Sequence, residues 1–396
     1  MMQRVIAGAF LANGETTIHN PCRSDDCLAA LGIIQAAGAT VVPGTSILIS
    51  KNTPVNPPKE VFCGESGLGT RMFTPILSLF QEEITILGGG SLKSRTMNML
   101  SSVLNQLGVR CITNQGKLPI RVKGPLKNGN VTLNGSITSQ FLTGLLMALP
   151  VTKGKSIIKV NSLNSRGYID LTLQVLRQFG IEISHERYEV FQIEGNQQYS
   201  PCEITIEGDW SGAAFHVVGA AISGKISISG LSCSSNQPDK KILDAIAQAG
   251  GIVDVNKNLI SIEKGDLNSF TFDATDCPDL FPPLAALAAN CKGTSTIKGV
   301  GRLLNKESDR AATIKSDLQS VGISVILKEN EMKITGGEIS GGTIDSHNDH
   351  RIAMMGGILA INAKSPISIV NSKAITKSYP NFFQTLNELG IQTEEC

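Results

Sequence analysis

The feature that most constrains this chain is an internal repeat with a period of about 70 residues. A turn or small residue followed by alternating β-branched residues returns along the whole sequence, and each copy predicts a strand. The copies lie at 13–18, 82–86, 153–158, 223–228, 292–297 and 364–369. Repetition at a fixed period indicates that one supersecondary unit is used six times.

A second marker keeps step with the first: an apolar helical pattern that ends in glycine and is followed by a short alternating stretch. In one copy Leu171, Val175 and Phe179 share a helical face before Gly180. Glycine favours the position just past a helix end because it adopts left-handed backbone angles at little cost. The six glycines are Gly38, Gly108, Gly180, Gly250, Gly322 and Gly390.

Six units of helix, strand, helix and strand predict an α/β protein with three units in each of two domains. A chain of 396 residues is long enough for two separate cores. The midpoint falls at a short polar stretch, so we predict domains at 1–207 and 208–396. A single six-unit ring is the alternative, and it fits the usual domain length less well.

Composition narrows the classes of partner and compartment. Lys and Arg number 35 against 34 Asp and Glu, so we expect neither a nucleic acid nor a membrane as partner. The apolar stretch 5–12 is either a signal peptide or a buried helix, and its recurrence inside the chain favours the helix. The nine cysteines show no CxxC and no zinc-ligand spacing, which predicts a reduced cytoplasmic location and no metal site.

Polar residues or glycine open the first helix of most units. Helix starts carry unpaired N–H groups and a partial positive charge, so several of them together predict a site for anions. Ordinary N-capping is the alternative for any single one. The openings are 64–71, 135–140, 209–212, 276–279 and 348–351, and the nearby cations are Arg71, Arg95, Arg310, Arg351 and Lys377. There is no P-loop or dinucleotide fingerprint, so nucleotide use is not predicted.

The densest charged cluster is Lys306-Glu307-Ser308-Asp309-Arg310, about 30 residues after Asp279. A solvated helix face with internal ion pairs is one interpretation. The other is functional: two carboxylates among several cations can be tuned to different pKa values, so that one gives a proton and one takes it. This pattern predicts an acid–base enzyme that acts on a small polyanion.

At these motifs the chain resembles the enolpyruvyl transferase family, and within it the branch that acts on a shikimate phosphate. The resemblance implies two domains, each built from three βαβαββ units about a pseudo-threefold axis. It runs from Arg4 almost to the C-terminus, through 64–71, 93–95, 135–140, 165–170, 278–279, 306–310, 348–351 and 377–380.

The resemblance also implies a reaction: the enolpyruvyl group of phosphoenolpyruvate is joined to the 5-hydroxyl of shikimate 3-phosphate, and phosphate is released. No metal or organic cofactor takes part, and a monomer is expected. Asp279 would take the hydroxyl proton and Glu307 would protonate the methylene carbon. The residues implied for phosphoenolpyruvate are Gly67, Arg95, Arg310, Arg351 and Lys377; those implied for shikimate 3-phosphate are Arg4, Thr138, Ser139, Ser165 and Lys306, with Gln140 between the two ligands.

The chain departs from the family pattern in a few places. Glu65 stands where Asn is usual and Leu68 where Thr is common, while Arg302 and Leu304 replace the usual Asn and Arg. The family also carries a Lys-Ser pair upstream of the position that matches Arg4. We therefore expect an N-terminal strand and two substrate contacts to be missing, either through a start codon assigned too late or through true truncation.

Two other functions compete with this one. The sister transferase that acts on a UDP-amino sugar carries a reactive Cys in a loop that corresponds to 88–95, and there is none here. A catalytically weak or inactive relic that binds anionic ligands is the alternative from a different class. The presence of both Asp279 and Glu307 favours the enzyme.

Overall fold

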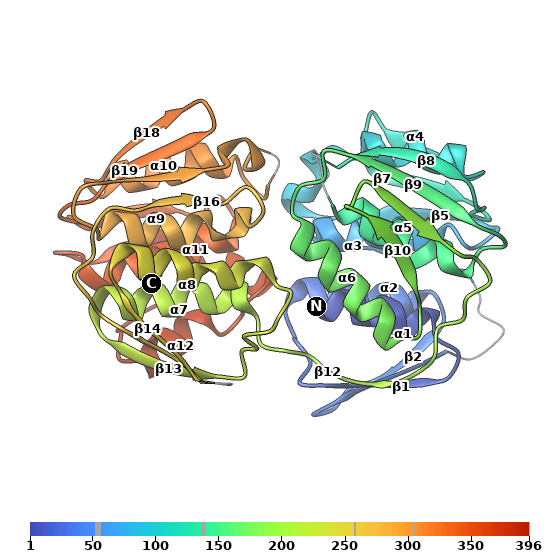
Figure 1. Cartoon of the computed structure of the whole chain (residues 1–396), viewed down its shortest axis with the longest axis horizontal. Helices are drawn as coiled ribbons and strands as arrows, with labels where there is room; N and C mark the ends of the chain where they lie inside the picture. The colour runs from blue at the N-terminus through green and yellow to red at the C-terminus, as the bar shows by residue number, and fades with distance from the viewer. Residues whose placement is uncertain (52–56, 136–138, 257–258, 305, 396) are drawn as a thin grey trace. The chain divides into compact units, whose positions relative to one another are not determined.

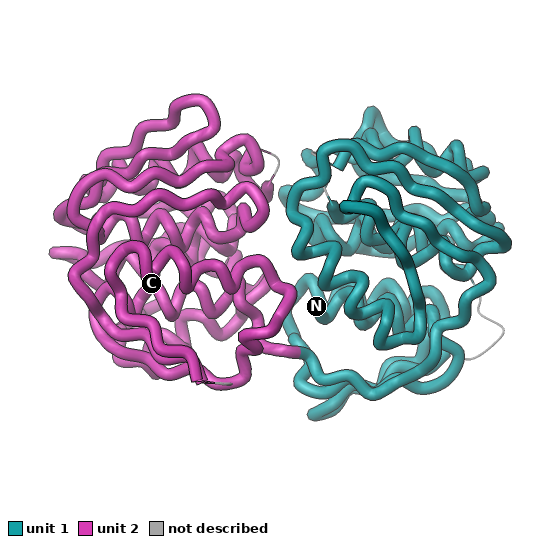
Figure 2. Tube along the Cα trace, viewed as in Figure 1, with its two compact units in different colours: residues 1–206 teal, residues 207–396 magenta. Residues whose placement is uncertain are grey.

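The computed structural model describes residues 1–51, 57–135, 139–256, 259–304 and 306–395. The chain divides into two compact units, Met1–Ile206 and Glu207–Cys396 (Figure 2). Each unit has its own hydrophobic core. In Figure 1 strands lie along the outer side of each unit, and the most buried helices, such as α5 (Gln140–Ala148) and α9 (Phe281–Ala289), lie inside.

Among its described residues, unit 1 contains three four-stranded sheets and six α-helices. The sheets have the orders β12-β1-β3-β2, β4-β5-β7-β6 and β8-β9-β11-β10. The strands are β1 (Glu15–His19), β2 (Ala39–Val42), β3 (Ile47–Lys51), β4 (Glu60–Phe62), β5 (Glu83–Leu87), β6 (Arg110–Asn114), β7 (Lys117–Lys123), β8 (Asn130–Asn134), β9 (Ser156–Asn161), β10 (Ile183–Glu186), β11 (Val190–Ile193) and β12 (Glu203–Thr205). The helices are α1 (Met2–Leu11), α2 (Asp25–Ala36), α3 (Gly67–Leu77), α4 (Asn98–Gln106), α5 (Gln140–Ala148) and α6 (Arg166–Gln178).

Unit 2 repeats the plan. Its sheets have the orders β13-β15-β14, β16-β17-β19-β18 and β20-β21. The strands are β13 (Lys225–Ser229), β14 (Ile252–Asn256), β15 (Leu259–Glu263), β16 (Thr271–Asp273), β17 (Thr294–Lys298), β18 (Ser324–Lys328), β19 (Glu331–Thr335), β20 (Gly342–Asp345) and β21 (Ile367–Val370). The helices are α7 (Trp210–Ser223), α8 (Ile242–Ala249), α9 (Phe281–Ala289), α10 (Arg310–Ser320), α11 (His350–Leu359) and α12 (Phe382–Glu388).

The sequence markers explain this layout. Every copy of the strand marker contains part of one strand, namely β1, β5, β9, β13, β17 or β21. All six marker glycines have left-handed backbone angles, with φ between 78° at Gly108 and 98° at Gly250. Helices such as α9 and α11 are apolar nearly all round and buried nearly all round, as expected of helices in the interior of a domain.

Parallel pairing links successive repeats. The pairs are β4 with β5, β8 with β9, β16 with β17 and β20 with β21, while β12 returns to pair with β1. Within the described residues β13 pairs with β15 alone, and Ile226 and Ile228 on β13 are only half-buried. The absence of the family's N-terminal strand stays a prediction.

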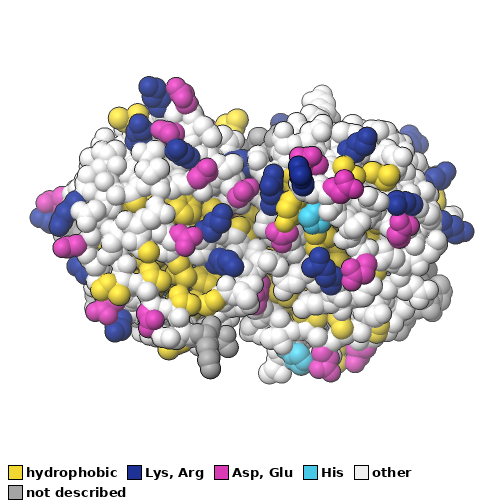
Figure 3. All heavy atoms as spheres, viewed as in Figure 1, with side chains coloured by type: hydrophobic (Ala, Val, Ile, Leu, Met, Phe, Trp, Pro, Cys, Tyr) yellow, Lys and Arg dark blue, Asp and Glu magenta, His cyan; other side chains and the backbone are white. Residues whose placement is uncertain are grey.

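The N-terminal apolar stretch forms α1, in which every residue except Gln3 is buried. This is the buried helix favoured above. Among the described helices none has the length and apolar character that crossing a membrane requires. On the face shown in Figure 3, Lys and Arg side chains are interspersed with Asp and Glu on both units, consistent with the near-zero net charge.

Candidate active site

Unit 2 places Asp279 in η4 (Pro278–Leu280), a 3-10 turn that leads into α9. The sequence predicted that Asp279 heads the helix itself; the helix instead begins at Phe281. Pro282 and Pro283 occupy the first turn of α9, where a missing N–H costs nothing. Asp279 therefore lies on a turn ahead of the helix rather than in its cap.

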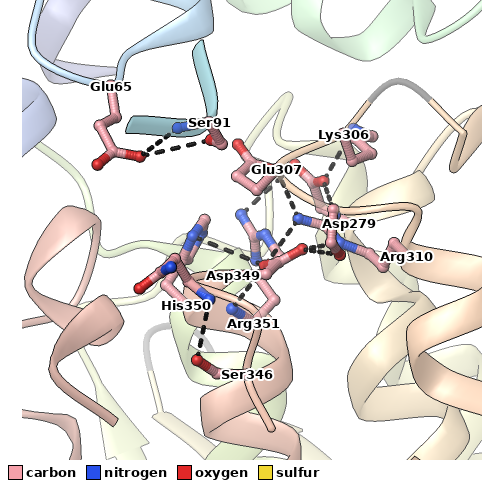
Figure 4. A network of polar contacts seen from close by, with 12 residues as sticks. Glu65, Ser91, Asp279, Lys306, Glu307, Arg310, Ser346, Asp349, His350 and Arg351 are labelled. Atoms are coloured by element: carbon pink, nitrogen blue, oxygen red, sulfur yellow. Dashed lines mark hydrogen bonds and ion pairs between the residues drawn. The ribbon is translucent and has the colours of Figure 1, made fainter. Parts of the chain in front are cut away.

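Three cations surround the Asp279 carboxylate (Figure 4). Lys306 Nζ and Arg310 Nη1 each lie 3.0 Å from its Oδ1, and Arg351 Nη2 lies 3.4 Å from Oδ2. Burial alone would raise the pKa of Asp279, but Arg351, Lys306 and Arg310 together hold that pKa well below its usual value. Asp279 is thus a carboxylate at neutral pH, able to accept a proton.

Arg310 is the centre of this network. Its side chain is fully buried and bonds three carboxylates: Nη2 to Glu307 at 2.7 Å, Nη1 to Asp279, and Nε to Asp349 Oδ2 at 2.8 Å. Burial lowers the pKa of Arg310, but Asp349, Glu307 and Asp279 more than offset this and raise it. The solvated helix face considered above is therefore wrong for this residue.

The same network fixes the neighbours of Arg310. The Glu307 side chain is 13% exposed and that of Lys306 is 21% exposed, so both lie where a ligand can reach them. Burial lowers the pKa of Lys306, with Asp279 acting in the opposite direction. Lys377 ends η7 (Ser372–Lys377) and is also buried, at 7% exposure.

At several of the predicted helix starts, the polar side chain caps the N-terminus of the helix. Ser66, Asp209 and Asp349 accept backbone N–H bonds from Gly69, Gly212 and Arg351 at 3.0, 2.9 and 3.0 Å. Asp349 does more than cap α11, because it also accepts two bonds from Arg310. The capping alternative therefore holds for Ser66 and Asp209, and Asp349 combines both functions.

Unit 1 contains a buried arginine of a different kind. Arg4, on α1, is 5% exposed and donates from Nε to Thr172 Oγ1 at 2.9 Å and from Nη2 to the Tyr168 carbonyl at 3.4 Å. Both acceptors are neutral and lie on α6. Burial lowers the pKa of Arg4 to about 10, so the side chain is still charged at neutral pH. A buried cation with neutral partners favours an anionic ligand.

Gly67, Arg71 and Arg95 come together at the start of α3. A Cβ atom at Gly67 would lie 2.6 Å from Arg95 Nη1 and 3.0 Å from Arg71 Nη1, so a larger residue here would displace the two guanidinium groups from their positions against this backbone. Arg71 is buried and donates to Gln140 Oε1 at 2.9 Å and to the Thr96 carbonyl at 3.1 Å. Gln140 is therefore held by Arg71.

Two further site residues that the family resemblance implies, Ser139 and Ser165, lie in the described part of unit 1. Ser139 precedes α5 and Ser165 precedes α6, and both are buried. Ser165 has φ 60° and ψ 46°, a left-handed conformation that is uncommon outside glycine and often marks a functional site. Thr138, which the family resemblance also implies, lies outside the described residues.

The structure brings together Asp279, Lys306, Glu307, Arg310 and Arg351 within unit 2, and Gly67 with Arg95 within unit 1. The sequence did not predict Asp349 as a carboxylate partner of Arg310. Asp349 lies in the helix start 348–351, which the sequence placed in an anion site, with N-capping as the alternative for any single start. Within the part of the chain that the structure describes, no cluster of His, Cys, Asp and Glu could hold a metal ion.

Comparison with known proteins gives consistent matches. The sequence model of the EPSP synthase family (3-phosphoshikimate 1-carboxyvinyltransferase) matches residues 1–386. A 3-phosphoshikimate 1-carboxyvinyltransferase from Clostridium botulinum (strain Alaska E43 / Type E3) is 35% identical over 403 residues, covering 98% of this chain and 93% of the relative. Its namesake from Clostridium acetobutylicum is 36% identical over 400 residues, covering 99% and 93%.

Solved structures share the fold. An EPSP synthase from Acinetobacter baumannii superposes with a TM-score of 0.85 at 24% identity, covering 99% of this chain and 94% of the other. The enolpyruvyl transferase NikO from Streptomyces tendae superposes with a TM-score of 0.77 at 17% identity, covering 98% and 92%. At these identities the likeness shows the fold, and it confirms the predicted two-domain enolpyruvyl transferase architecture.

Proposed function

This chain belongs to the EPSP synthase family, and from that premise we propose that it is a 3-phosphoshikimate 1-carboxyvinyltransferase (EC 2.5.1.19). It transfers the enolpyruvyl group of phosphoenolpyruvate to the 5-hydroxyl of shikimate 3-phosphate and releases phosphate, a step towards chorismate and the aromatic amino acids. The observation that carries the proposal is the unit 2 network, in which a carboxylate held ionised by three cations lies beside a second, partly exposed carboxylate.

Asp279 and Glu307 have separate tasks in this reaction. Asp279 takes the proton of the 5-hydroxyl as that oxygen attacks C2 of phosphoenolpyruvate, and its lowered pKa supports a base that is ionised before substrate arrives. Glu307, in its protonated form when the substrates are bound, delivers its proton to the methylene carbon and gives a tetrahedral intermediate. The Glu307 carboxylate then takes a proton back from the new methyl group as the C–O bond to phosphate breaks, which restores the double bond. Phosphate leaves with the electrons of that bond and takes up the proton held by Asp279.

The cations bind and orient the two anionic substrates. Arg95, Arg310, Arg351 and Lys377, with the Gly67 backbone, hold phosphoenolpyruvate, because guanidinium groups match carboxylate and phosphate oxygens in pairs. Fixed cations also stabilise charge that develops on the intermediate without having to reorganise.

Shikimate 3-phosphate is bound by a second set. Its phosphate is assigned to Arg4, Ser139 and Ser165, with Thr138 from the family resemblance. Lys306 binds the end of the ring, and Gln140 lies between the two ligands. The buried charge of Arg4 supports this assignment, because a phosphate dianion would supply the counter-charge that Thr172 and Tyr168 do not. We also propose that the two compact units are the two domains, in cytoplasmic protein, and that the chain acts as a monomer.

The test is turnover with the two proposed substrates. Purified protein is incubated with shikimate 3-phosphate and phosphoenolpyruvate, and both phosphate release and the enolpyruvyl product are followed. We expect phosphate and product in equal amounts, and no phosphate when either substrate is omitted. If ligands bind without phosphate release, the inactive-relic alternative is correct instead.

A further inference from the structure

Unit 1 contains a pair of buried threonines that the proposed mechanism does not use. Thr172 lies on α6 and Thr143 on α5, and both residues are 0% exposed. Their hydroxyl oxygens lie 3.1 Å apart. Burying a hydroxyl is unfavourable unless its hydrogen bonds are made, so the partners of this pair indicate what it does.

The Thr172 hydroxyl makes every hydrogen bond that a hydroxyl can make. It donates to the Tyr168 carbonyl, one turn earlier on α6, at 2.8 Å, and it accepts from Arg4 Nε at 2.9 Å. Because its one proton goes to Tyr168, the contact with Thr143 requires the Thr143 hydroxyl to donate. Among its bonding partners in the described residues, Arg4 is the charged one.

These bonds fix the orientation of the Arg4 guanidinium group. Arg4 Nε is bound to the Thr172 hydroxyl, and Arg4 Nη2 is bound to the Tyr168 carbonyl at 3.4 Å. The guanidinium group is planar and rigid, so two of its nitrogens determine where the third lies. The position of Nη1, which bonds no acceptor among the described residues, is therefore set by α6.

The same threonine pair connects Arg4 to the two serines assigned to the substrate phosphate. Ser139 lies one turn before Thr143, and its carbonyl accepts the Thr143 N–H at 3.0 Å. Ser165 lies just before α6, and its carbonyl accepts the Tyr168 N–H at 3.2 Å. Helix α6 packs against both α1 and α5. The pair thus joins the three helices whose residues are assigned to the phosphate.

We infer that Thr172, supported by Thr143, is a positioning residue for the shikimate phosphate: its hydroxyl orients Arg4 before the substrate binds. The inference rests on the proposed function. Without the Thr172 hydroxyl, Arg4 would sample more orientations, and binding would have to order this long side chain as well as form its contacts. A side chain that is already oriented avoids that cost, which raises the affinity for the ligand.

The experiment measures calorimetric binding of shikimate 3-phosphate to wild type, Thr172→Val and Thr172→Ser. Val keeps the shape of the side chain and removes the hydroxyl, whereas Ser keeps the hydroxyl. We expect Thr172→Val to bind about 3–10-fold more weakly, the effect of roughly one hydrogen bond, and Thr172→Ser to bind within about twofold of wild type.

Thr74→Val is the matched control. Thr74 is a buried threonine of α3 that also donates to the carbonyl one turn earlier, that of Thr70, but its hydroxyl does not bond Arg4. We expect Thr74→Val to bind shikimate 3-phosphate as tightly as wild type. A loss in Thr74→Val equal to that in Thr172→Val would overturn the inference, because any buried hydroxyl of unit 1 would then have the same effect.

A double-variant cycle separates an effect through Arg4 from a loosened fold. If Thr172 acts through Arg4, its effect disappears once the guanidinium group is gone, so Thr172→Val in an Arg4→Gln background should bind as Arg4→Gln does. An equal fold-loss in both backgrounds contradicts the inference. Unchanged affinity in Thr172→Val, with normal binding by wild type, overturns the inference and leaves the proposed function standing.

The wild type provides an independent test if Thr172→Val does not fold. The NMR signal of the Arg4 Nε–H proton is identified by its absence from the spectrum of Arg4→Gln. A proton bonded to a buried hydroxyl should exchange slowly with water before any substrate is added. Fast exchange in the free protein contradicts the inference. If the wild type does not bind shikimate 3-phosphate, the proposed function fails, and the inference fails with it.

Discussion

Arg4 in unit 1 and Arg310 in unit 2 are both buried arginines, and their surroundings differ in charge. Arg310 bonds Asp279, Glu307 and Asp349, which raise its pKa, whereas Arg4 bonds a hydroxyl and a carbonyl, and burial lowers its pKa to about 10. The same side chain thus organises a charge-balanced network in one unit, while in the other its hydrogen-bond acceptors among the described residues are neutral. We propose from this contrast that Arg310 is fixed before substrate binds, and that Arg4 gains its counter-charge from the ligand.

Loss of either proposed proton-transfer group should have the largest effect. Asp279→Asn and Glu307→Gln keep the shape of the side chains but remove the charge that makes each a base or an acid. We expect kcat to fall by about 10²–10⁴-fold in each, with KM changed much less, as for other positioned acids and bases. Steady-state assays of phosphate release measure this, and wild-type turnover in either variant would disprove the assignment.

Arg310→Gln should break the unit 2 network. It leaves Asp349 buried without its guanidinium partner, and such a break costs about 3–5 kcal/mol of unfolding free energy. Denaturant unfolding followed by the emission of Trp210 reports this directly, because the chain has one tryptophan and it lies buried in unit 2. Arg166→Gln, at an exposed arginine of unit 1, is the control and should leave the midpoint within experimental error. Equal midpoints for Arg310→Gln and wild type would show that the network contributes little.

Acid should destabilise the Arg310 network in unit 2 before it destabilises the surroundings of Arg4 in unit 1. The carboxylates that bond Arg310 take up protons in acid, whereas the partners of Arg4, a hydroxyl and a carbonyl, do not. The pKa of Asp279 is lowered, so its contribution to stability is present above pH about 4 and is lost as pH falls towards the folded value. The pKa values of Asp239 and Asp317 are raised to about 6, so the folded protein gains stability as these groups take up protons between pH about 6 and about 4. The pKa of His216 is lowered to about 4, so the folded protein loses stability as pH falls towards that value, because the unfolded chain binds this proton first.

We therefore expect the start of α10 to lose amide protection below pH about 4, before the start of α1 does. Hydrogen exchange of peptides from each helix, pulsed at a series of pH values, measures this order. Simultaneous loss in both helices would mean that the carboxylates of the network do not set the acid stability of unit 2.

Glu65→Asn should have the smallest effect, although it restores the residue usual in the family. Glu65 accepts bonds from the backbone N and the hydroxyl of Ser91 at 3.3 and 3.4 Å, in the 3-10 turn η1 (Gly90–Ser94) that precedes Arg95 (Figure 4). Asn can accept the same bonds with a neutral oxygen, so stability should change by no more than about 0.5 kcal/mol. A change in KM for phosphoenolpyruvate above about threefold would show that the Glu65 charge acts on Arg95.

Much of the fold could be predicted because local signals repeat. The strand markers and Gly38, Gly108 and Gly180 depend on side-chain alternation and on left-handed backbone angles, which a sequence displays directly. The turn at Asp279 could not be predicted, since the position of Pro282 and Pro283 allows both a helix start and a preceding 3-10 turn.

The charged residues of the site could be predicted from the sequence, but the residues that they bond could not. Lys306 to Arg310 form a dense local cluster, and Glu307 and Arg310 do bond each other. Arg4 and Thr172 are 168 positions apart, and no local pattern links them.

The central contrast is tested most directly by calorimetric binding of shikimate 3-phosphate to wild type, Arg4→Gln and Arg187→Gln. Arg187 is an exposed arginine of unit 1, so its variant removes the same formal charge away from the buried position. We predict that wild type and Arg187→Gln bind with equal affinity and that Arg4→Gln binds about 10–100-fold more weakly, the cost of losing a charge-assisted phosphate contact. Equal affinity in Arg4→Gln and wild type would contradict the account, because the buried charge of Arg4 would then have no part in holding the ligand.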